Sequence, residues 1–353
     1  MVTQTQTLSS AVGSLSLSGS ALAPLEPSGV LDQYKPTDLT PVIGRQFDNV
    51  QLKDLLDAPN SDELLKELAI TIHRRNVVFF KNQQEQLTDS QLKTLARKLG
   101  QLTGGEGRLH IHPTEIDRED KEISPIKAAE FKRRRGQGSQ LASRGWHSDI
   151  TFEPIPSDIA ILTLTEIPAS GGGDTLWASA YELYDRLTPA FASFLEGLTA
   201  VHTAPQFHEV AKARGVPLYV DERGHPENVG GKLEAVHPVI RINPVTGWKG
   251  LFVNPVFTKR IVELNQDESD RILTYLGALV KENHDAQVRF TWQPRDVALW
   301  SNTSSLHNVT LDYSGMDRVG HRAVSLGDRP FFHREAGGRS RREALGLPKW
   351  LED

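Results

Sequence analysis

The sequence predicts a mainly β protein with flanking helices, built as a β-sandwich or jelly roll rather than as a parallel α/β sheet. From residue 146 onward, short apolar runs of strand length alternate with turns that contain Gly or Pro. These runs cover residues 159–166, 174–178, 237–242, 248–254, 288–292, 296–301 and 319–326. Helical periodicity interrupts them at 181–197 and 267–282. No G-x-G-x-x-G or Walker A loop follows a strand, so a nucleotide-binding fold is not indicated.

Local signals define the remaining elements. Residues 61–75 begin with a capping Ser and space Leu and Ile as a helix does, and residues 76–80 (NVVFF) predict a short buried strand. Residues 88–100 indicate a second helix that ends at Gly100. Residues 243–247 (NPVTG) predict a turn that joins two strands into a hairpin.

The composition excludes several classes of protein. The chain has 353 residues with 40 Lys and Arg against 45 Asp and Glu, a net charge of −5, so we expect neither nucleic acid nor a membrane surface as partner. Because there is no Cys, disulfides, thiolate nucleophiles, zinc fingers and Cys-ligated iron–sulfur clusters are excluded, and any transition metal must have nitrogen and oxygen ligands. No 20-residue apolar span or basic leader is found, so the expected location is cytoplasmic.

The chain is expected to form one domain. Residues 1–30 predict a disordered tail, because this Ser-, Thr- and Gly-rich stretch has no aromatic side chain to bury. Residues 31–353 form the domain. Within it, residues 104–145 carry many charges and glycines, including the basic run at 132–135, and predict a mobile lid. The basic run is either a solvated loop or an attractor of anionic substrate.

A His-x-Asp pair suggests a metal site. If His147 and Asp149 lie on an extended strand, their side chains share one face. A third ligand from a distant strand would complete a site of two histidines and one carboxylate, which leaves three open positions on Fe(II). Three His-x-Asp/Glu pairs occur, at His147, His225 and His333, against about 1.5 expected by chance, and only the first opens a predicted sheet.

Two arginines follow near the C-terminal end of the predicted sheet. Arg318 and Arg322 are four residues apart and would share a face of one strand. An Arg that faces the interior is costly unless an anion meets it, so two inward arginines imply two anionic groups. A surface or structural ion pair is the alternative for either one.

The order of these motifs closely resembles the taurine/α-ketoglutarate dioxygenase family over residues 39–332. The resemblance depends on His147-x-Asp149, the run Gly172-Gly173-Asp174-Thr175-Leu176-Trp177, His307, Arg318-x-x-His321-Arg322-Ala323, and Leu326-Gly327-Asp328-Arg329-Pro330. It implies a double-stranded β-helix (jelly-roll) core and the use of Fe(II), 2-oxoglutarate and O₂.

The resemblance also implies roles for individual residues. His147, Asp149 and His307 would be the iron ligands and the catalytic centre. Thr175 and Arg318 would hold the distal carboxylate of 2-oxoglutarate. The substrate anion would meet Arg322 and His112, between aromatic walls formed by Phe207 and Phe257. Because His110 lies two residues before His112, a separate metal-binding pair of these histidines and a purely structural role remain alternatives.

The expected function is oxidation of a C–H bond in a small anionic substrate, with release of succinate and CO₂. An organosulfonate or sulfate ester is favoured; an amino acid or other carboxylate in a biosynthetic pathway is the alternative. Ser143 and Thr114-Glu115 stand where taurine oxygenases carry a polar amide and an aromatic residue, so taurine itself is not the expected substrate. A zinc hydrolase or a non-catalytic jelly-roll binding protein is the alternative of another class. The chain is a monomer or a homo-oligomer.

Overall fold

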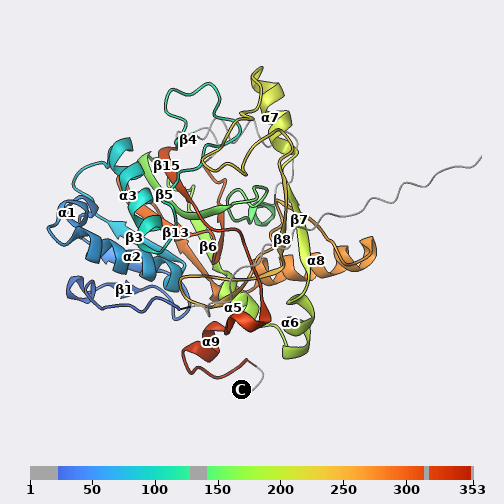
Figure 1. Ribbon diagram of the computed structural model, residues 1–353. Coiled ribbons are helices and arrows are strands. Elements are labelled where there is room, and N and C mark those ends of the chain that lie inside the picture. Colours follow the sequence, from blue (N-terminus) through green and yellow to red (C-terminus); the bar gives the residue numbers. More distant parts are fainter. Residues whose placement is uncertain (1–22, 128–140, 314–317, 351–353) are drawn as a thin grey trace, which may run out of the picture.

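The computed structural model describes residues 23–127, 141–313 and 318–350, and its strands form one large and three small sheets (Figure 1). The large sheet has the strand order β1-β2-β3-β13-β5-β15-β4, in which all neighbours are antiparallel except β2 and β3. Its strands are β1 (Thr37–Asp38), β2 (Arg45–Asp48), β3 (Val77–Lys81), β13 (Val297–Ser301), β5 (Ser157–Glu166), β15 (Val319–Leu326) and β4 (Ile123–Lys127).

The small sheets are antiparallel. One has the order β12-β6-β14 and faces the large sheet, and a second has the order β11-β7-β8; the third is the β9–β10 hairpin. Their strands are β12 (Gln287–Phe290), β6 (Thr175–Ser179), β14 (Ser305–Val309), β11 (Thr258–Ile261), β7 (Thr199–Thr203), β8 (Glu234–Pro238), β9 (Ile240–Ile242) and β10 (Lys249–Leu251).

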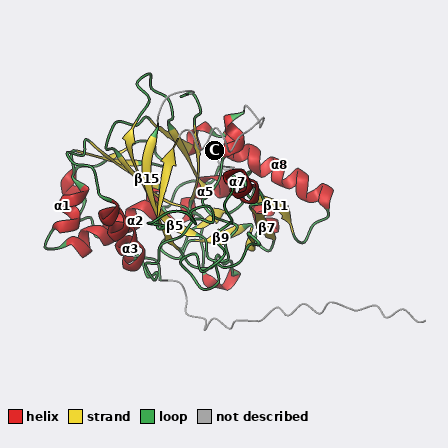
Figure 2. Ribbon diagram, turned by 90° about the horizontal axis from the view of Figure 1, so that it is seen from above, coloured by secondary structure: helices red, strands yellow, loops and turns green. Residues whose placement is uncertain are grey.

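Helices flank the sheets on both sides (Figure 2). The helices α1 to α3 cover the outer face of the large sheet, whereas α5, α6 and α8 pack near the hairpin and the β11-β7-β8 sheet. Their bounds are α1 (Leu52–Asp57), α2 (Ser61–Arg75), α3 (Asp89–Leu102), α5 (Ala180–Asp185), α6 (Pro189–Leu195), α7 (Gln206–Arg214), α8 (Gln266–Glu282) and α9 (Arg341–Ala344). The prediction of a mainly β fold with flanking helices is confirmed.

Alternation along the strands explains the two-sided core. In β3, Val78 and Phe80 pack on the helices, whereas Val77 and Phe79 face the β12-β6-β14 sheet. Phe79 stacks on Phe290 of β12 with ring centroids 4.2 Å apart. Burial of both faces explains why this strand is a continuous apolar run and not an alternating one. The layer between the two sheets is therefore an apolar core rich in aromatic side chains.

Some predicted boundaries are wrong for local reasons. The α3 helix runs past Gly100 to Leu102, because Gly100 has no positive φ that would end the helix there. The predicted helix 181–197 is two helices, because Thr188 caps a new one that starts at Pro189. The α2 helix starts at Ser61, but Ser61 is not its cap; Asn60 holds that position, and its side chain makes no capping bond to the helix backbone. The predicted strand 237–242 is divided between β8 and β9.

The predicted tail and lid are only partly described. Residues 1–22, and residues 128–140 with the basic run of the lid, lie outside the described residues. The Leu25 amide donates to the Val245 carbonyl at 2.8 Å, so part of the expected tail contacts the domain. The described part of the expected lid before residue 128 is bound to the large sheet. Its strand β4 pairs with β15, and the His110 amide donates to the Val324 carbonyl at 2.9 Å. Within the described part of the chain, no helix is both long and apolar enough to cross a membrane.

Candidate active site

A cavity of about 140 Å³ opens between the large sheet and the β12-β6-β14 sheet. Strands β4, β5, β13 and β15 contribute to one wall, and β6 and β14 to the other. All nine candidate residues from the sequence line it. The complete lining is His112, Ile126, His147, Asp149, Ile150, Phe152, Leu162, Thr175, Phe207, Phe257, Trp300, His307, Val309, Arg318 and Arg322.

A backbone bridge brings the two histidines of the candidate metal site together. The His147 amide donates to the His307 carbonyl at 3.0 Å, and the His307 amide donates to the His147 carbonyl at 2.7 Å. Residues paired directly across antiparallel chains project their side chains to the same side. The two imidazole centroids accordingly lie 4.2 Å apart, although 160 positions separate the residues.

Asp149 reaches the site from a turn, which corrects the prediction of a continuous strand. Only His147 makes a β-bridge, and Ile150 has a left-handed φ of 50°, a conformation that is strained for a β-branched residue. The buried Asn302 side chain holds this turn, because its Oδ1 accepts the Asp149 amide at 3.0 Å. The turn therefore directs the carboxylate toward both imidazoles.

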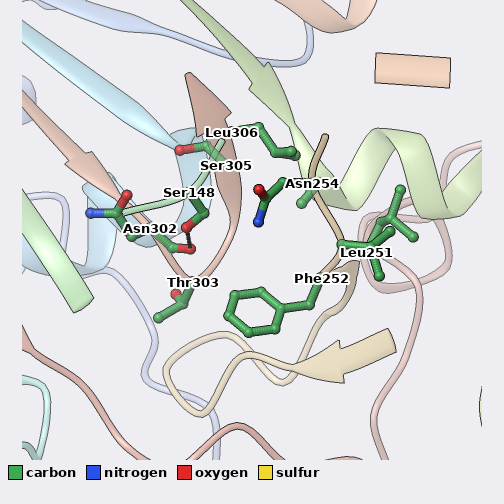
Figure 3. A pocket seen from close by; sticks show the side chains of 10 residues that line it. Ser148, Leu251, Phe252, Asn254, Asn302, Thr303, Ser305 and Leu306 are labelled. Atoms are coloured by element: carbon green, nitrogen blue, oxygen red, sulfur yellow. Dashed lines mark hydrogen bonds between the residues drawn. The ribbon is translucent and has the colours of Figure 1, made fainter. Parts of the chain in front are cut away.

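A small pocket lies beside this turn and is lined by Ser148 and Asn302 (Figure 3). The Ser148 hydroxyl donates to the Asn302 carbonyl at 2.6 Å, beside a void of about 10 Å³. Such a void holds about one water molecule. Leu251, Phe252 and Asn254 close its other side. The ligand-bearing turn thus has little room to move away from the cavity.

The donor set fits a transition metal. Ligand atoms of His147, Asp149 and His307 lie within 4.8 Å of one another. The Gly145 carbonyl lies 2.7 Å from Nδ1 of His147 and accepts its proton, which leaves Nε2 as a lone-pair donor 3.8 Å from Asp149 Oδ1. Nε2 of His307 lies 3.8 Å from Asp149 Oδ2, a buried oxygen that has no hydrogen-bond partner among the described residues. This unpartnered oxygen is what a ligand carboxylate needs.

The protonation states suit the same role. Burial, followed by the neighbouring His147, lowers the pKa of His307 to about 3, and burial also lowers the pKa of His147. Burial alone would raise the pKa of Asp149, but Arg322 and the two imidazoles outweigh it and hold that pKa well below its usual value. At neutral pH the site therefore offers two neutral imidazoles and one carboxylate.

Arg318 lines the cavity and is only 3% exposed. Its Nε donates to the Gly173 carbonyl at 3.0 Å, and its Nη2 lies 3.5 Å from the Thr175 hydroxyl. The Trp292 indole donates to the same hydroxyl at 3.0 Å. A Cβ on Gly173 would come within 2.7 Å of Arg318 Cδ, so the glycine makes room for the guanidinium. Within the described residues, no carboxylate forms an ion pair with Arg318.

Arg322 also faces the cavity, as its spacing from Arg318 predicts, but it contacts a metal-ligand candidate. Its Nη1 donates to Asp149 Oδ1 at 2.8 Å, and its buried Nε has no hydrogen-bond partner in the part of the chain that the structure describes. The intervening His321 points away and contacts Asp89 of α3 at 2.6 Å, as expected for a structural residue.

Aromatic rings close the cavity opposite Arg322. Phe207 of α7 meets the His112 ring edge to face at 4.6 Å, and Phe257 meets His147 at 5.9 Å. Phe152, which the sequence analysis did not single out, contacts both phenylalanines. Nδ1 of His112 lies 2.8 Å from the Thr114 hydroxyl and 3.3 Å from the Thr114 amide nitrogen, so Thr114 fixes the orientation of this ring.

Buried polar residues behind the cavity were not predicted. The Arg223 guanidinium donates to both oxygens of Glu153, and His110 Nε2 lies 3.6 Å from the same carboxylate. His110 therefore belongs to a structural ion-pair network and does not line the cavity with His112. The available signals were a single Glu within an apolar segment at 150–155 and the polar Asn302 at the end of a buried strand.

Two histidines and a carboxylate between β sheets are the facial donor set of a mononuclear non-haem iron oxygenase. The chain belongs to the family described as "Taurine catabolism dioxygenase TauD, TfdA family", whose model matches residues 35–324. It is a 2-oxoglutarate-dependent dioxygenase, in a family that uses Fe(II), 2-oxoglutarate and O₂.

Three similar proteins illustrate the range of the family. The alpha-ketoglutarate-dependent dioxygenase esdpJ of Penicillium shearii is 39% identical over 92% of this chain and 96% of its own length. The alpha-ketoglutarate-dependent sulfonate dioxygenase of Saccharomyces cerevisiae is 31% identical over 84% of this chain and 68% of its own. A solved structure of a Burkholderia xenovorans protein, titled as an alpha-ketoglutarate-dependent taurine dioxygenase, is 28% identical with a TM-score of 0.66 over 84% of this chain and 91% of that one.

Proposed function

We propose that this dioxygenase oxidises a C–H bond of a small organosulfonate or sulfate ester and converts 2-oxoglutarate to succinate and CO₂. In this proposal His147, Asp149 and His307 hold Fe(II), and Arg318 with Thr175 binds the distal carboxylate of 2-oxoglutarate. Arg322 and His112 bind the anionic group of the substrate. The two facing sheets form the double-stranded β-helix core that holds these residues.

The observation that carries the proposal is the pair of arginines in one mostly apolar cavity. A buried guanidinium without an anion is costly, and Arg318 has no carboxylate partner within the described chain. Arg322 has one, but uses only Nη1 to reach it, and its buried Nε is unpaired within residues 23–127, 141–313 and 318–350. Both arginines thus retain donors for further anions, which supports a site for a dicarboxylate and an anionic substrate.

Each part of the cavity has a chemical task. Bound iron supplies the activation of O₂ that drives decarboxylation of 2-oxoglutarate and oxidation of the substrate C–H bond. The paired backbones of His147 and His307, with the turn at Asp149, fix the ligands that position this centre. Arg322 and His112 orient the substrate by its anion, while Phe152, Phe207 and Phe257 exclude water from the reacting carbon.

Sulfonates and sulfate esters are favoured for two reasons. The yeast relative is named for sulfonates, and its similarity covers most of this chain. A hydroxyl introduced on the carbon that bears sulfonate or sulfate also collapses to an aldehyde and a released anion. An amino acid or another carboxylate is the second candidate, because a guanidinium binds carboxylates by the same bidentate geometry, and the name of the Penicillium shearii relative specifies no substrate.

A substrate panel tests the proposal. The protein is supplied with Fe(II) and 2-oxoglutarate, and substrate-stimulated O₂ uptake is measured with alkylsulfonates, sulfate esters, carboxylates, amino acids and neutral analogues. We expect another sulfonate or a sulfate ester to stimulate O₂ uptake more than taurine does. Arg322→Ala should remove most of this stimulation. Arg329→Ala, an exposed arginine outside the cavity, is the matched control. Preference for a neutral compound, with Arg322→Ala harmless, would overturn the proposal.

A further inference from the structure

Arg322 is shared between two binding sites. On one side its Nη1 is 2.8 Å from Oδ1 of Asp149, and on the other its guanidinium lines the cavity together with the aromatic walls. The two oxygens of the Asp149 carboxylate also differ in their contacts, because Oδ1 accepts from Arg322 while Oδ2 is buried without a hydrogen-bond partner among the residues that the structure describes. One carboxylate oxygen is therefore held by the arginine and the other is available to a metal.

We propose that Arg322 couples metal binding to binding of the substrate anion, so that each ligand raises the affinity of the cavity for the other. This inference rests on the proposed function, in which Asp149 is an iron ligand and Arg322 meets the substrate anion. It adds that the two events are not independent, since one guanidinium takes part in both.

The charges of the cavity give the direction of this coupling. Before any ligand binds, Arg318 and Arg322 bring two positive charges against the single negative charge of Asp149. A divalent cation next to Asp149 adds further positive charge within a few ångströms of Arg322, in surroundings that screen poorly. An anion on Arg322 offsets this repulsion and draws the guanidinium away from Asp149, which frees the carboxylate for the metal. Linkage requires the reciprocal effect to be equally large.

A purely positioning role for Arg322 predicts a different result. If the arginine only holds Asp149 in its rotamer, loss of the guanidinium leaves the carboxylate less well oriented and weakens metal binding. If it mainly repels the metal until an anion arrives, its loss strengthens metal binding. Arg318 provides the comparison, because it lines the same cavity but does not contact Asp149.

The experiment measures Mn²⁺ binding by electron paramagnetic resonance without 2-oxoglutarate, alone and with butane-1-sulfonate or its neutral analogue butane-1-sulfonamide. For the wild type we expect the sulfonate, and not the sulfonamide, to tighten Mn²⁺ binding at least about fivefold. Arg322→Gln should bind Mn²⁺ alone more tightly than the wild type does and should show no effect of sulfonate. Arg318→Gln should retain the coupling.

Two results would overturn the inference: Mn²⁺ affinity that is unchanged by sulfonate in the wild type, or weaker Mn²⁺ binding by Arg322→Gln than by the wild type. Succinate formation by the wild type is measured in parallel. If succinate forms but no coupling is found, only the inference fails. If Mn²⁺ does not bind and no succinate forms, the proposed function itself fails.

Discussion

Arg318 shows how a single residue is specified by its surroundings. Its guanidinium is enclosed by the Gly173 carbonyl, the Thr175 hydroxyl and the Tyr313 ring, whose centroid is 6.0 Å from the guanidinium carbon. Burial lowers its pKa, yet the shift leaves an arginine cationic at neutral pH. A buried guanidinium of this kind can bind a carboxylate through two parallel hydrogen bonds.

We predict that Arg318→Ala weakens 2-oxoglutarate binding by roughly 30-fold or more, because a buried charge-assisted contact is worth about 2–5 kcal/mol. Arg318→Lys should restore little, since lysine lacks the planar fork. Calorimetric titration of 2-oxoglutarate into the Mn²⁺-loaded protein measures this, with Arg329→Ala as control. Equal affinities of the wild type and Arg318→Ala would contradict the assignment.

The residues that sequence reasoning found differ from those it missed in the kind of signal they carry. His147 with Asp149, and Arg318 with Arg322, stand at fixed short spacings. Asn302 has no such spacing to Asp149, because the contact between them spans 153 positions and exists only after folding. The ion pair of Arg322 with Asp149 could not be predicted for the same reason. The spacing of two arginines predicts that they share a face of a strand, but it does not predict which side chains they contact.

Among the elements, α7 is tied to the segment that carries His112. Arg214 at the end of α7 donates from Nη2 to both oxygens of Asp117 at 2.7 Å, and from Nη1 to the Thr114 carbonyl. The Tyr219 amide adds a bond to the Pro113 carbonyl at 2.8 Å. Through these links α7 keeps Phe207 against the His112 ring.

We predict that Arg214→Met raises the KM for the primary substrate about two- to fivefold and leaves kcat nearly unchanged. The ion pair is partly exposed and therefore worth at most about 1 kcal/mol, and it acts on substrate contacts rather than on the metal. The KM for 2-oxoglutarate should not change. Lys212→Met, on an exposed position of the same helix, is the matched control. A fall in kcat at constant KM would place Arg214 in another role.

Elements with strong periodicity were predicted well. The strand 319–326 and the helix 61–75 have the predicted bounds, because apolar spacing and charged ends coincide there. The β14 strand was missed, although it carries His307, because Ser305–Val309 (SLHNV) mixes polar and apolar residues that are nearly all buried. A contact with a distant segment satisfies one of its polar side chains, because the Asn308 amide donates to the Ala142 carbonyl at 2.7 Å.

At the scale of the whole molecule, buried charges connect the helical layer to the sheets. Asp158 of β5 lies 3.5 Å from His73 of α2 and near Arg241 of β9. Burial, followed by the charge of Asp328, raises the pKa of Asp158 to about 7, against the opposing effect of Arg241. Burial and the same arginine lower the pKa of His73 to about 3, so the histidine is neutral and does not compensate the carboxylate.

This arrangement predicts a pH dependence of stability. The folded protein binds the Asp158 proton more tightly than the unfolded chain does. The contribution of this proton to the free energy of unfolding is therefore complete below pH 4 and is lost as the pH rises to about 7. The slope from this one proton is at most about 1.4 kcal/mol per pH unit. Urea unfolding at pH 5 and pH 8 should show a smaller loss of stability for Asp158→Asn than for the wild type or the exposed-site control Asp57→Asn. The same loss in all three proteins would exclude this role.

We propose above that one cavity between the two sheets holds both the iron and 2-oxoglutarate. Anaerobic titration of 2-oxoglutarate into the Fe(II)-loaded protein examines both at once, because chelation of iron by 2-oxoglutarate produces a visible charge-transfer band. We expect this band for the wild type and for Arg329→Ala, and its loss in His147→Ala, Asp149→Ala and His307→Ala with the fold retained by circular dichroism. An undiminished band in folded Asp149→Ala would show that the iron and 2-oxoglutarate are not held at this site.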